Sequence, residues 1–328
     1  MTSNDNGKEA TMQTPFTELV GCSVPIQQAP MGNVSTPELA VAVANAGGVG
    51  SVTALFMPAP AVDAMLGTMA AQTDGALSVN FLTQTFDPEA IAAAAPHVRI
   101  VDFFWADPDP SVVEIAHAGG ALASWQVGSG DEARAAADAG CDLVIAQGIE
   151  AGGHVRATEP LDTVLRATLD AVDVPVLAAG GIADARSLAR VIDAGAAGAR
   201  IGTRFVATHE SGAHPDYKQA IIEAAAGSTE ITDAFAVCPL CATYPHCRVL
   251  KRAIDAVRHT HDDVVGEATL GDASFPVPRG SGMPPGATTT GDIAAMAMYA
   301  GESVASIHEI TSVAEAIEAL CSELSPSV

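Results

Sequence analysis

The sequence predicts an α/β protein built as a TIM-type (β/α)8 barrel, with an inserted segment after the eighth strand and helices at the C-terminus. Two observations support this prediction. From about residue 25 to about residue 205, short apolar runs alternate with Ala-rich amphipathic stretches, the pattern of repeated βα units. Eight apolar runs can be counted, and successive runs start roughly 20 to 30 residues apart, which leaves room for one short helix and two loops per unit.

The predicted helices between these strands follow one design. The stretch STPELAVAVANAG begins with Ser35 or Thr36 as N-cap and Pro37 in the first turn, and it ends at Gly47. The stretches GDEARAAADAG and ADARSLARVIDAG repeat this design and each closes on a glycine. The predicted strands are Pro25 to Ala29, Gly48 to Thr53, Leu77 to Phe81, Arg99 to Phe104, Ala121 to Gln126, Asp142 to Gln147, Pro175 to Ala179 and Gly198 to Gly202.

After the eighth strand the regular spacing ends, and residues 227–290 are expected to form a lid or small subdomain over the barrel mouth. This segment carries a cysteine cluster, a charged helix near Arg248 to His261, and the Pro- and Gly-rich loop PVPRGSGMPPGATTTGD. Residues 291–328 are expected to supply two amphipathic helices that pack on the barrel. Residues 1–14 are expected to be a disordered lead-in, which leaves residues 15–226 for the barrel.

Charge and hydropathy exclude several classes of partner. The 39 acidic and 15 basic residues give a formal charge of −24, which repels nucleic acid and anionic lipid surfaces. No apolar run reaches the roughly 18 residues of a membrane span, and the polar N-terminal stretch lacks the apolar core of a secretory signal, so we expect a cytoplasmic protein. A salt-adapted host and a GC-rich genome explain the acidity equally well. The oligomeric state stays open, with a homodimer as one option.

Three of the six cysteines, Cys238, Cys241 and Cys247, cluster beside His246 in CPLCATYPHC. The CxxC spacing is compatible with a zinc site or a redox pair. Three thiols in a compact loop are nevertheless favoured, because no export signal is present and the adjacent His246 and Cys247 point in different directions in a regular backbone. No metal is therefore assigned.

The motif QGIEAGGH, Gln147 to His154, is the strongest indication of a catalytic site. It follows a buried apolar run, and its glycines allow the backbone to approach a ligand closely or to adopt positive φ. His154 is therefore expected at the carboxyl end of the sixth strand, where α/β barrels hold their catalytic groups. A histidine suits general-base catalysis near neutral pH, and the alternative is a histidine bonded to a loop carbonyl.

The other strand ends carry small, amide or hydroxyl residues, which suit hydrogen bonding to a polar planar ligand. The glycines of AAGGIAD and RIGTRF, after the seventh and eighth strands, are typical of a phosphate site made by backbone amides and a short helix. A tight βα turn explains either glycine turn alone, but two on consecutive strands favour phosphate. In chain order the strand ends offer Pro30, Met31, Gly32, Asn80, Trp105, Gln126, Gln147, Gly180, Gly181, Gly202 and Thr203.

Several segments together carry a recognisable family pattern. They are APMGNVSTPELAVAVANAGGVGSV, VNFLTQ, WQVGSGDEARAAADAGCDLVIAQGIEAGGH, VPVLAAGGIADARSLARVIDAGAAGARIGTRFVAT and GDIAAMAMYAGESV, spread over about Pro25 to Ser211 and Thr290 to Val304. This pattern resembles the nitronate monooxygenases, formerly called 2-nitropropane dioxygenases. The resemblance implies a TIM barrel with non-covalent FMN and makes His154 the catalytic base. It places FMN against Ala29, Pro30, Met31, Asn80, Gln126, Gln147, Gly152, Gly180, Gly181, Gly202 and Thr203.

The resemblance implies an enzyme whose small-molecule substrate is an alkyl nitronate or nitroalkane, oxidised by dioxygen to a carbonyl compound and nitrite. Relatives with the same EAGGH motif are NAD(P)H-dependent enoyl-acyl-carrier-protein or quinone reductases, and this alternative stays open. A non-flavin barrel for a phosphorylated metabolite is weakened because none of the three lysines lies near a strand end. A metal-sensing module would depend on the cysteine insertion, which departs from the family pattern and leaves the substrate undefined.

Four further residues are weaker candidates. Glu150 either orients His154, contacts ribityl hydroxyls or is a solvated loop carboxylate. Phe104 and Trp105 either line the substrate side or pack at the barrel rim. Tyr299 is expected to pack within a C-terminal helix.

Overall fold

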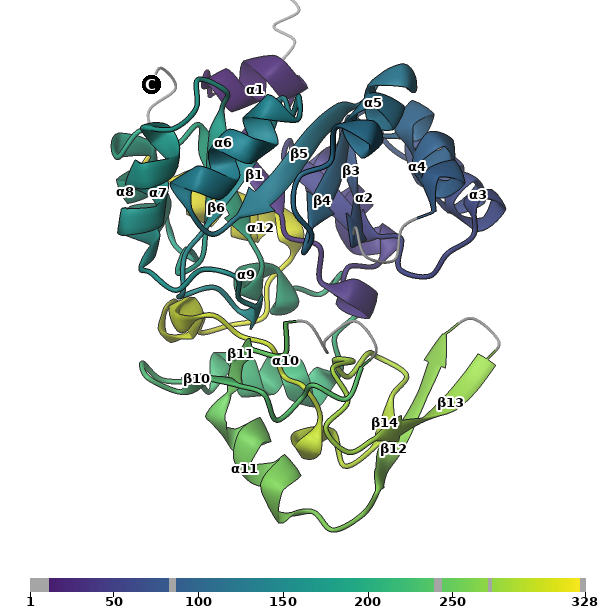
Figure 1. Ribbon diagram of the computed structural model, residues 1–328. Helices are drawn as coiled ribbons and strands as arrows, with labels where there is room; N and C mark the ends of the chain where they lie inside the picture. The colour runs from purple at the N-terminus through teal and green to yellow at the C-terminus, as the bar shows by residue number, and fades with distance from the viewer. Residues whose placement is uncertain (1–11, 83–86, 239–243, 271–272, 325–328) are drawn as a thin grey trace, which may run out of the picture.

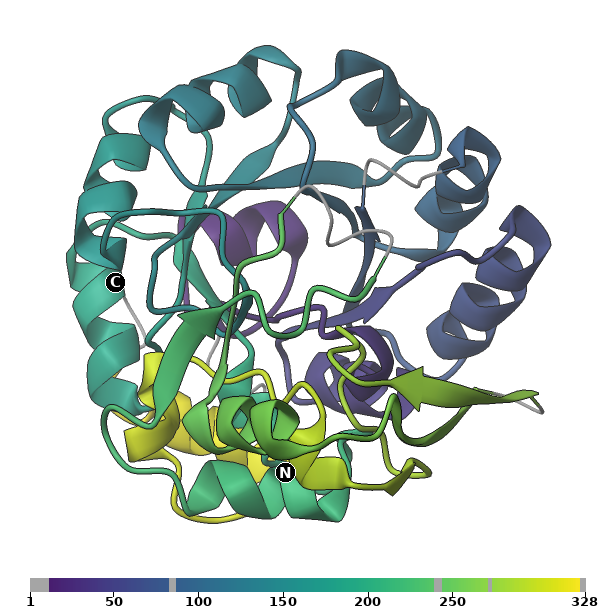
Figure 2. The ribbon, with the colours of Figure 1, turned by 60° about the horizontal axis from the view of Figure 1, so that its bottom comes forward.

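A computed structural model describes residues 12–82, 87–238, 244–270 and 273–324. Its main part is a closed barrel of parallel strands in the order β1-β2-β3-β4-β5-β6-β8-β9, surrounded by helices (Figure 1, Figure 2). Every barrel strand lies where the sequence periodicity predicts one, so the (β/α)8 prediction is confirmed. The barrel strands are β1 (Ile26–Gln28), β2 (Val49–Thr53), β3 (Ala76–Leu82), β4 (Ile100–Phe104), β5 (Leu122–Val127), β6 (Leu143–Gln147), β8 (Val176–Ala179) and β9 (Gly198–Ile201).

The interior of the barrel is apolar at the end where the strands begin and polar further along them. At the apolar end, Ile100 and Leu143 belong to one cluster with Phe16 of helix α1 (Pro15–Val20), which was not predicted from the sequence. Further along β4 and β9, the buried residues Asp102 and Arg200 meet inside the barrel. Polar groups therefore lie between the apolar floor of the barrel and its mouth.

Helices cover the outside of the barrel, and side-chain caps fix where they begin. Thr36 accepts a hydrogen bond from the backbone of Leu39 at the start of α2, as predicted, and Ser129 and Asp184 cap α6 and α8 in the same way. The last helix, α12, packs against both α2 and α8 and so completes the ring of helices. The helices are α2 (Pro37–Asn45), α3 (Ala59–Ala70), α4 (Pro88–Ala94), α5 (Pro110–Ala118), α6 (Gly130–Asp138), α7 (Leu161–Leu169), α8 (Ala185–Asp193) and α12 (Val313–Cys321).

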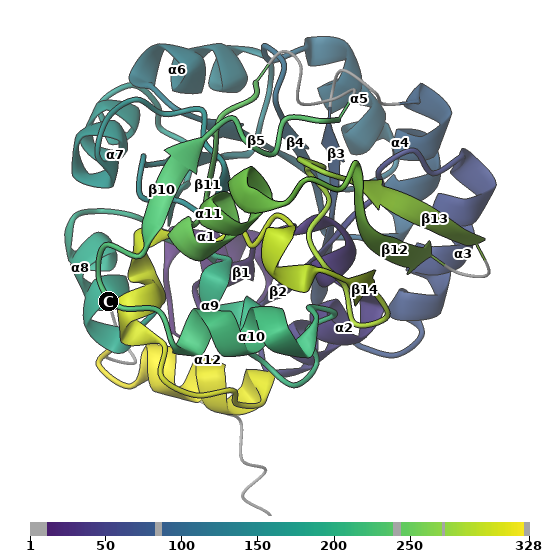
Figure 3. The ribbon, with the colours of Figure 1, turned by 90° about the horizontal axis from the view of Figure 1, so that it is seen from below.

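A second hydrophobic core lies beyond the carboxyl ends of the barrel strands (Figure 1, Figure 3). This core contains residues of helix α10, helix α11 and residues 293–307, so it extends across the predicted boundaries at 226/227 and 290/291. These domain boundaries stay a prediction. Two small antiparallel sheets, β10-β11-β7 and β13-β12-β14, belong to this region. Its elements are β7 (Gly153–His154), α9 (Thr203–Val206), α10 (Pro215–Ile222), β10 (Thr229–Thr232), β11 (Cys247–Leu250), α11 (Lys251–His259), β12 (Val264–Leu270), β13 (Ala273–Pro278) and β14 (Thr290–Gly291).

Two expectations for the inserted segment are wrong at their edges. The charged helix begins only at Lys251, because Arg248 belongs to β11 and pairs with β10 and β7. The Pro- and Gly-rich stretch is not loop throughout, since residues 276–278 finish β13 and residues 290–291 form β14. In both cases strand pairing with a distant segment decides the conformation.

The expectation of two C-terminal α-helices is also wrong, because α12 is the only α-helix among the described residues 292–324. The preceding stretch contains two short 3-10 helices, Ile293–Ala295 and Glu302–Ser306. The backbone of this stretch also bonds to other segments: the Met298 carbonyl accepts from the Leu250 amide at 2.9 Å, and the Glu302 amide donates to the Glu150 carbonyl at 3.0 Å. These tertiary hydrogen bonds take the place of helical ones.

The predicted lead-in, residues 1–14, extends too far along the chain. The Met12 amide donates to the Ser23 carbonyl at 3.0 Å, and the Thr14 side chain caps helix α1 through the backbone amide of Thr17. Residues 1–11 lie outside the described residues. Within the described part of the chain, no helix is both long enough and apolar enough to cross a membrane.

Candidate active site

The predicted ligand residues lie along the rim where the barrel strands end, and several of them meet there. A Cβ atom added to Gly202 would lie 3.4 Å from the Ala29 Cβ and 3.7 Å from the Met31 Sδ. A Cβ atom on Gly180 would lie 3.0 Å from the backbone nitrogen of Ala151, inside the QGIEAGGH motif. The ends of β1 and β9 therefore adjoin each other, and the end of β8 adjoins the motif that follows β6.

The two glycine turns keep the features that predicted a phosphate site. Gly180 and Gly181 have φ angles of 111° and 70°, a backbone region that disfavours any side chain. Helix α9 begins at Thr203, one residue after β9, and the amides of Phe205 and Val206 donate to the Gly202 carbonyl, which leaves the amides of Thr203 and Arg204 without an acceptor within the helix. The Thr203 hydroxyl accepts a hydrogen bond from the Gly301 amide at 3.0 Å, which fixes this turn against the C-terminal segment.

Gln147 holds its own loop, a role that the sequence does not reveal. Its Nε2 donates to the His154 carbonyl at 3.0 Å, and its Oε1 accepts from the Arg156 amide at 2.9 Å. Both polar ends of this amide are thus used inside the protein. Gln147 therefore positions the backbone that follows the histidine side chain, on either side of Val155, and its predicted contact with FMN stays a prediction.

Two glycines of the motif are needed for packing. A Cβ on Gly148 would lie 2.5 Å from the Leu161 Cα, and one on Gly152 would lie 2.5 Å from the backbone nitrogen of Gly301. The Glu150 carboxylate accepts the Leu161 amide at 2.9 Å at the start of α7, a structural contact that none of its predicted roles included. The motif is therefore a closely packed loop, and its histidine is the group that it presents.

His154 lies in the short strand β7, where it pairs in register with Cys247 of β11. Its ring is edge-on to the Trp105 ring at a centroid distance of 4.8 Å, and the Tyr299 ring lies 5.8 Å away on another side. Burial of the His154 ring disfavours its charged form, the imidazolium, and lowers the pKa of His154 to about 4. The imidazole is therefore neutral at physiological pH and able to accept a proton.

This environment predicts how His154 titrates. We expect its ring resonances, followed by NMR in the ligand-free protein, to stay those of a neutral imidazole as the pH falls to about 5 and to change only near pH 4. In the unfolded chain the same group takes up a proton near pH 6.5, so acidification from about 6.5 to 4 also lowers the free energy of unfolding. A titration midpoint near 6.5 in the folded protein would contradict this account.

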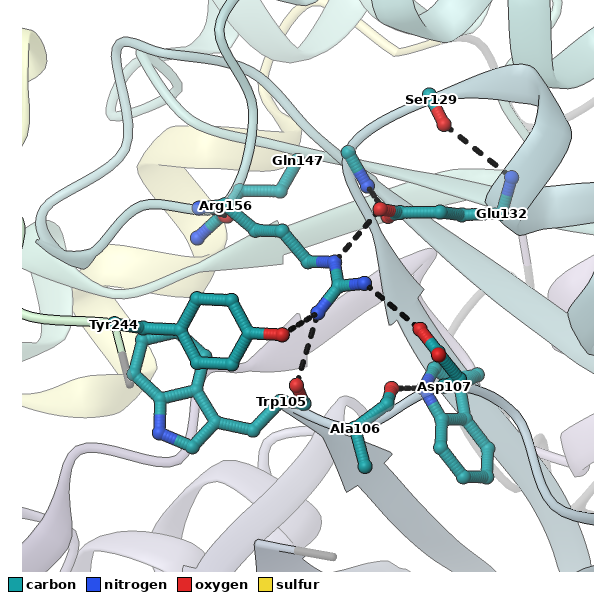
Figure 4. A network of polar contacts seen from close by, with 10 residues as sticks. Trp105, Ala106, Asp107, Ser129, Glu132, Gln147, Arg156 and Tyr244 are labelled. Atoms are coloured by element: carbon teal, nitrogen blue, oxygen red, sulfur yellow. Dashed lines mark hydrogen bonds and ion pairs between the residues drawn. The ribbon is translucent and has the colours of Figure 1, made fainter. Parts of the chain in front are cut away.

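Arg156, two residues after the histidine, was missed by the sequence analysis and forms the centre of a polar network at the rim (Figure 4). Its Nε donates to Glu132 at 2.8 Å, and its Nη1 donates to the Trp105 carbonyl at 2.9 Å and to the Tyr244 hydroxyl at 3.1 Å. Burial opposes the charge of this guanidinium, but the hydrogen bond and attraction to Glu132 outweigh it and raise its pKa. Arg156 thus joins β4, α6 and the inserted segment beside the candidate base.

Trp105 adopts a conformation that is rare for a bulky residue. Its φ angle is 87°, in the left-handed region, and its side chain is buried. Its ring contacts Phe104, Tyr244 and His154, with centroid distances of 4.7, 4.6 and 4.8 Å. Because Arg156 holds the Trp105 carbonyl, this strained residue is fixed as one wall of the space around His154.

We expect Arg156→Met to lower the free energy of unfolding by about 2–3 kcal/mol, because several hydrogen bonds to a largely buried guanidinium are lost. Urea titration followed by tryptophan fluorescence measures this loss. Arg134→Met is the matched control: Arg134 pairs with Asp131 on the surface, its side chain is 56% exposed, and its loss should cost less than about 1 kcal/mol. Equal effects of the two substitutions would show that the network does not stabilise the rim.

The side chains of Asn80 and Gln126 belong to a second network of polar contacts, which lies inside the barrel. Asn80 donates to the Asp102 carboxylate at 2.8 Å, Gln126 accepts from Arg200 at 3.0 Å, and Arg200 contacts Asp102 at 2.6 Å. Neither charged residue was predicted from the sequence as part of the site. The sequence did contain a signal for both: Asp102 interrupts the otherwise apolar strand IVDFF, and Arg200 interrupts the otherwise apolar strand GARI.

Comparison with known proteins settles the family. A family model described as nitronate monooxygenase matches residues 13–97 and 83–323. The chain belongs to the nitronate monooxygenase family. Among curated relatives, the nitronate monooxygenase of Pseudomonas aeruginosa is 32% identical, over 67% of this chain and 77% of that protein. A second relative, from Rhodococcus jostii, is 38% identical, and the match covers 62% of this chain but only 57% of that protein. Its name is (3aS,4S,5R,7aS)-5-hydroxy-7a-methyl-1-oxo-octahydro-1H-indene-4-carboxyl-CoA dehydrogenase.

Two solved structures have the same architecture over nearly the whole chain. FabK from Thermotoga maritima superposes with a TM-score of 0.75 at 27% identity, over 95% of this chain and 96% of that one. A nitroalkane oxidase from Streptomyces ansochromogenes gives a TM-score of 0.72 at 27% identity, over 94% and 97% of the two chains. The inserted region and the barrel are therefore both contained in these similarities.

The cysteine insertion of this nitronate monooxygenase family member shows no metal site in the part that can be described. Cys247 is buried in β11, its thiol lies 3.7 Å from the Thr232 carbonyl, and burial raises its pKa to about 12. Cys241 lies outside the described residues, and Cys238 is partly exposed. Among the described residues no group of three or more His, Cys, Asp or Glu side chains is placed to hold a metal ion.

Tyr299 has a different role from the one expected. It does not lie in an α-helix; its backbone bridges to Val249 of β11, and its hydroxyl donates to the Gly282 carbonyl at 2.6 Å. Its ring faces His154, so the C-terminal segment of the family pattern contributes to the site itself. Tyr244 of the cysteine insertion, which was not predicted from the sequence, also contributes to the site, because its ring packs against Trp105.

Proposed function

We propose that this protein is an FMN-dependent nitronate monooxygenase that oxidises alkyl nitronates, and nitroalkanes after deprotonation, to a carbonyl compound and nitrite with dioxygen. The observation that carries the proposal is His154, a neutral imidazole at the carboxyl end of β6 between Trp105 and Tyr299. The family membership supports it, since the chain has the family's barrel and the family's pattern around this histidine.

The residues at the mouth fit FMN in their chemistry. The small residues Ala29, Gly180 and Gly202 let the strand ends approach one another closely at the rim, and the turns after β8 and β9 suit a phosphate. Two amide side chains, on Asn80 and Gln126, supply polar groups without charge. Pro30, Met31, Gln147, Gly152, Gly181 and Thr203 complete the proposed contacts, and Gln147 and Gly152 also hold the loop around His154.

His154 is the group to which we assign the proton transfer. A neutral nitroalkane loses a proton from the carbon next to its nitro group, and the imidazole accepts it. The resulting imidazolium lies beside an anionic nitronate, and their attraction in a site with little water compensates for the low pKa of His154. Bound FMN supplies the redox chemistry between nitronate and dioxygen, and the aromatic walls limit access of water.

A second candidate is an FMN-dependent NAD(P)H oxidoreductase on the same barrel. The similarity to FabK over nearly the whole chain favours it, and so do the relatives named as CoA-ester dehydrogenases. Both activities require FMN at the barrel mouth. They differ in the electron donor, which is a nitronate in the first and NAD(P)H in the second.

The test is a visible spectrum followed by anaerobic mixing with the two donors. We expect the purified protein to show flavin absorbance and to bleach rapidly with an alkyl nitronate but slowly with NADH or NADPH. Rapid bleaching by a nicotinamide donor without nitronate would establish the second candidate. A protein that neither contains nor binds flavin would overturn both.

A further inference from the structure

The buried ion pair between Asp102 and Arg200 spans the barrel. Strands β4 and β9 stand on opposite sides of the closed ring, and the two side chains meet between them at 2.6 Å. The exposed fractions are 1% for Asp102 and 2% for Arg200. The cost of removing two charges from water offsets much of their attraction, so such a pair contributes little net stability. Its effect on the neighbouring side chains is more specific.

The charges fix the orientation of the amides around the pair. One of them, Gln27, accepts from Arg200 at 3.0 Å and donates to the Ser78 hydroxyl at 3.3 Å, so both of its ends are used inside the barrel. A guanidinium can only donate, so the Gln126 group 3.0 Å from Arg200 Nη1 must be its carbonyl oxygen, Oε1. A carboxylate can only accept, so the Asn80 group 2.8 Å from Asp102 Oδ2 must be its nitrogen, Nδ2. The usual ambiguity between the two ends of an amide is thereby removed at both positions.

Gln126 and Asn80 are each left with one polar atom that the described part of the chain does not use: Nε2 of Gln126, a donor, and Oδ1 of Asn80, an acceptor. The two residues lie near the ends of β5 and β3, on either side of β4, at the barrel mouth. Gln147, on β6, has no such free end, since both its polar atoms hold the loop around His154.

We propose that the Arg200–Asp102 pair is a positioning device that presents one donor and one acceptor to the pyrimidine edge of the flavin. That edge alternates carbonyl acceptors with the N3–H donor, so it needs partners of both kinds. The Gln126 amide serves a ring carbonyl, and the Asn80 oxygen serves N3–H. This inference rests on the proposed function, because it requires FMN at the mouth, and it assigns the ion pair and the two amides their parts in recognising it.

The test compares FMN with N3-methyl-FMN, which lacks the N3–H donor, by fluorescence titration of the flavin-free full-length protein. We expect the wild-type protein to bind FMN about tenfold more tightly than the methylated analogue, the loss from one unmade hydrogen bond. In Asp102→Asn the new amide nitrogen faces Asn80, whose NH2 then turns to the mouth. That variant should bind FMN about tenfold more weakly and lose the discrimination.

Further variants separate orientation from general damage. Asn80→Leu should lose the discrimination equally, and adding Asp102→Asn to it should weaken FMN binding no further, because both act through one contact. Ser124→Ala is the matched control: it removes a 2.7 Å hydrogen bond to the same carboxylate but leaves the Asp102 Oδ2 acceptor in place, so discrimination should persist.

The outcomes distinguish this inference from the proposed function. A wild-type protein that does not bind FMN overturns the proposed function and the inference with it. A wild-type protein that binds FMN but does not discriminate, or an Asp102→Asn variant that discriminates normally, overturns the inference alone. Multiplicative effects of the two substitutions in the double variant also overturn it.

Discussion

Replacing His154 by alanine is expected to lower kcat/KM for a neutral nitroalkane by about a hundredfold, while turnover of the preformed nitronate changes little. The value lies at the low end of the range for positioned bases, because burial between Trp105 and Tyr299 lowers the pKa to about 4 and so weakens the base. The preformed nitronate has already lost its proton and does not need this step. Steady-state assays of nitrite release with both substrate forms measure the difference.

The control for this substitution is His261→Ala, since His261 is an exposed histidine of the inserted region. It should leave both activities unchanged. Equal losses on nitroalkane and nitronate in His154→Ala would show that the histidine binds substrate or shapes the loop and does not accept the proton.

Breaking the ion pair inside the barrel should have the largest effect on stability. We expect Asp102→Ala to lower the free energy of unfolding by about 3–5 kcal/mol, because Arg200 is left charged and without its carboxylate in the barrel interior. Asn80 and Ser124 also lose their acceptor. Urea unfolding of wild type and variant measures the difference.

Two comparisons make this result specific. Glu223→Ala breaks the Arg252–Glu223 pair, whose 3.1 Å contact lies at the surface, and it should cost less than about 1 kcal/mol. Combining Asp102→Leu with Arg200→Met removes both charges and should recover part of the loss. A cost for Asp102→Ala as small as that of the surface pair would contradict the burial of this ion pair.

The barrel strands could be predicted because each is marked locally. In a parallel barrel most strands are short apolar runs, and turn and cap residues such as Thr36 and Asp184 mark where the helices between them begin. The inserted region could not be predicted in this way. There, short strands such as β7 and β11 exist because they pair with each other, 93 residues apart at Cys247 and His154, and neither carries a strong pattern of its own.

The candidate base illustrates the same division within the site. The glycines and the preceding apolar strand place His154 at a strand end, and that much is local. Its low pKa is not, because it depends on rings from β4 and from the C-terminal segment, Trp105 and Tyr299. Arg156 was missed for a related reason: an arginine in a loop is ordinary until its partners on other elements are known.

By itself, the sequence determined the order of the strands, the helix starts and the position of His154, because each follows from residues that are near one another in the chain. Only the tertiary structure decided which polar groups inside the barrel are used and which remain for a ligand. Asp102 and Arg200 are 98 residues apart, and their pairing fixes the orientation of Asn80 and Gln126. Such a contact arises when the barrel closes and excludes water, so no local pattern of residues specifies it.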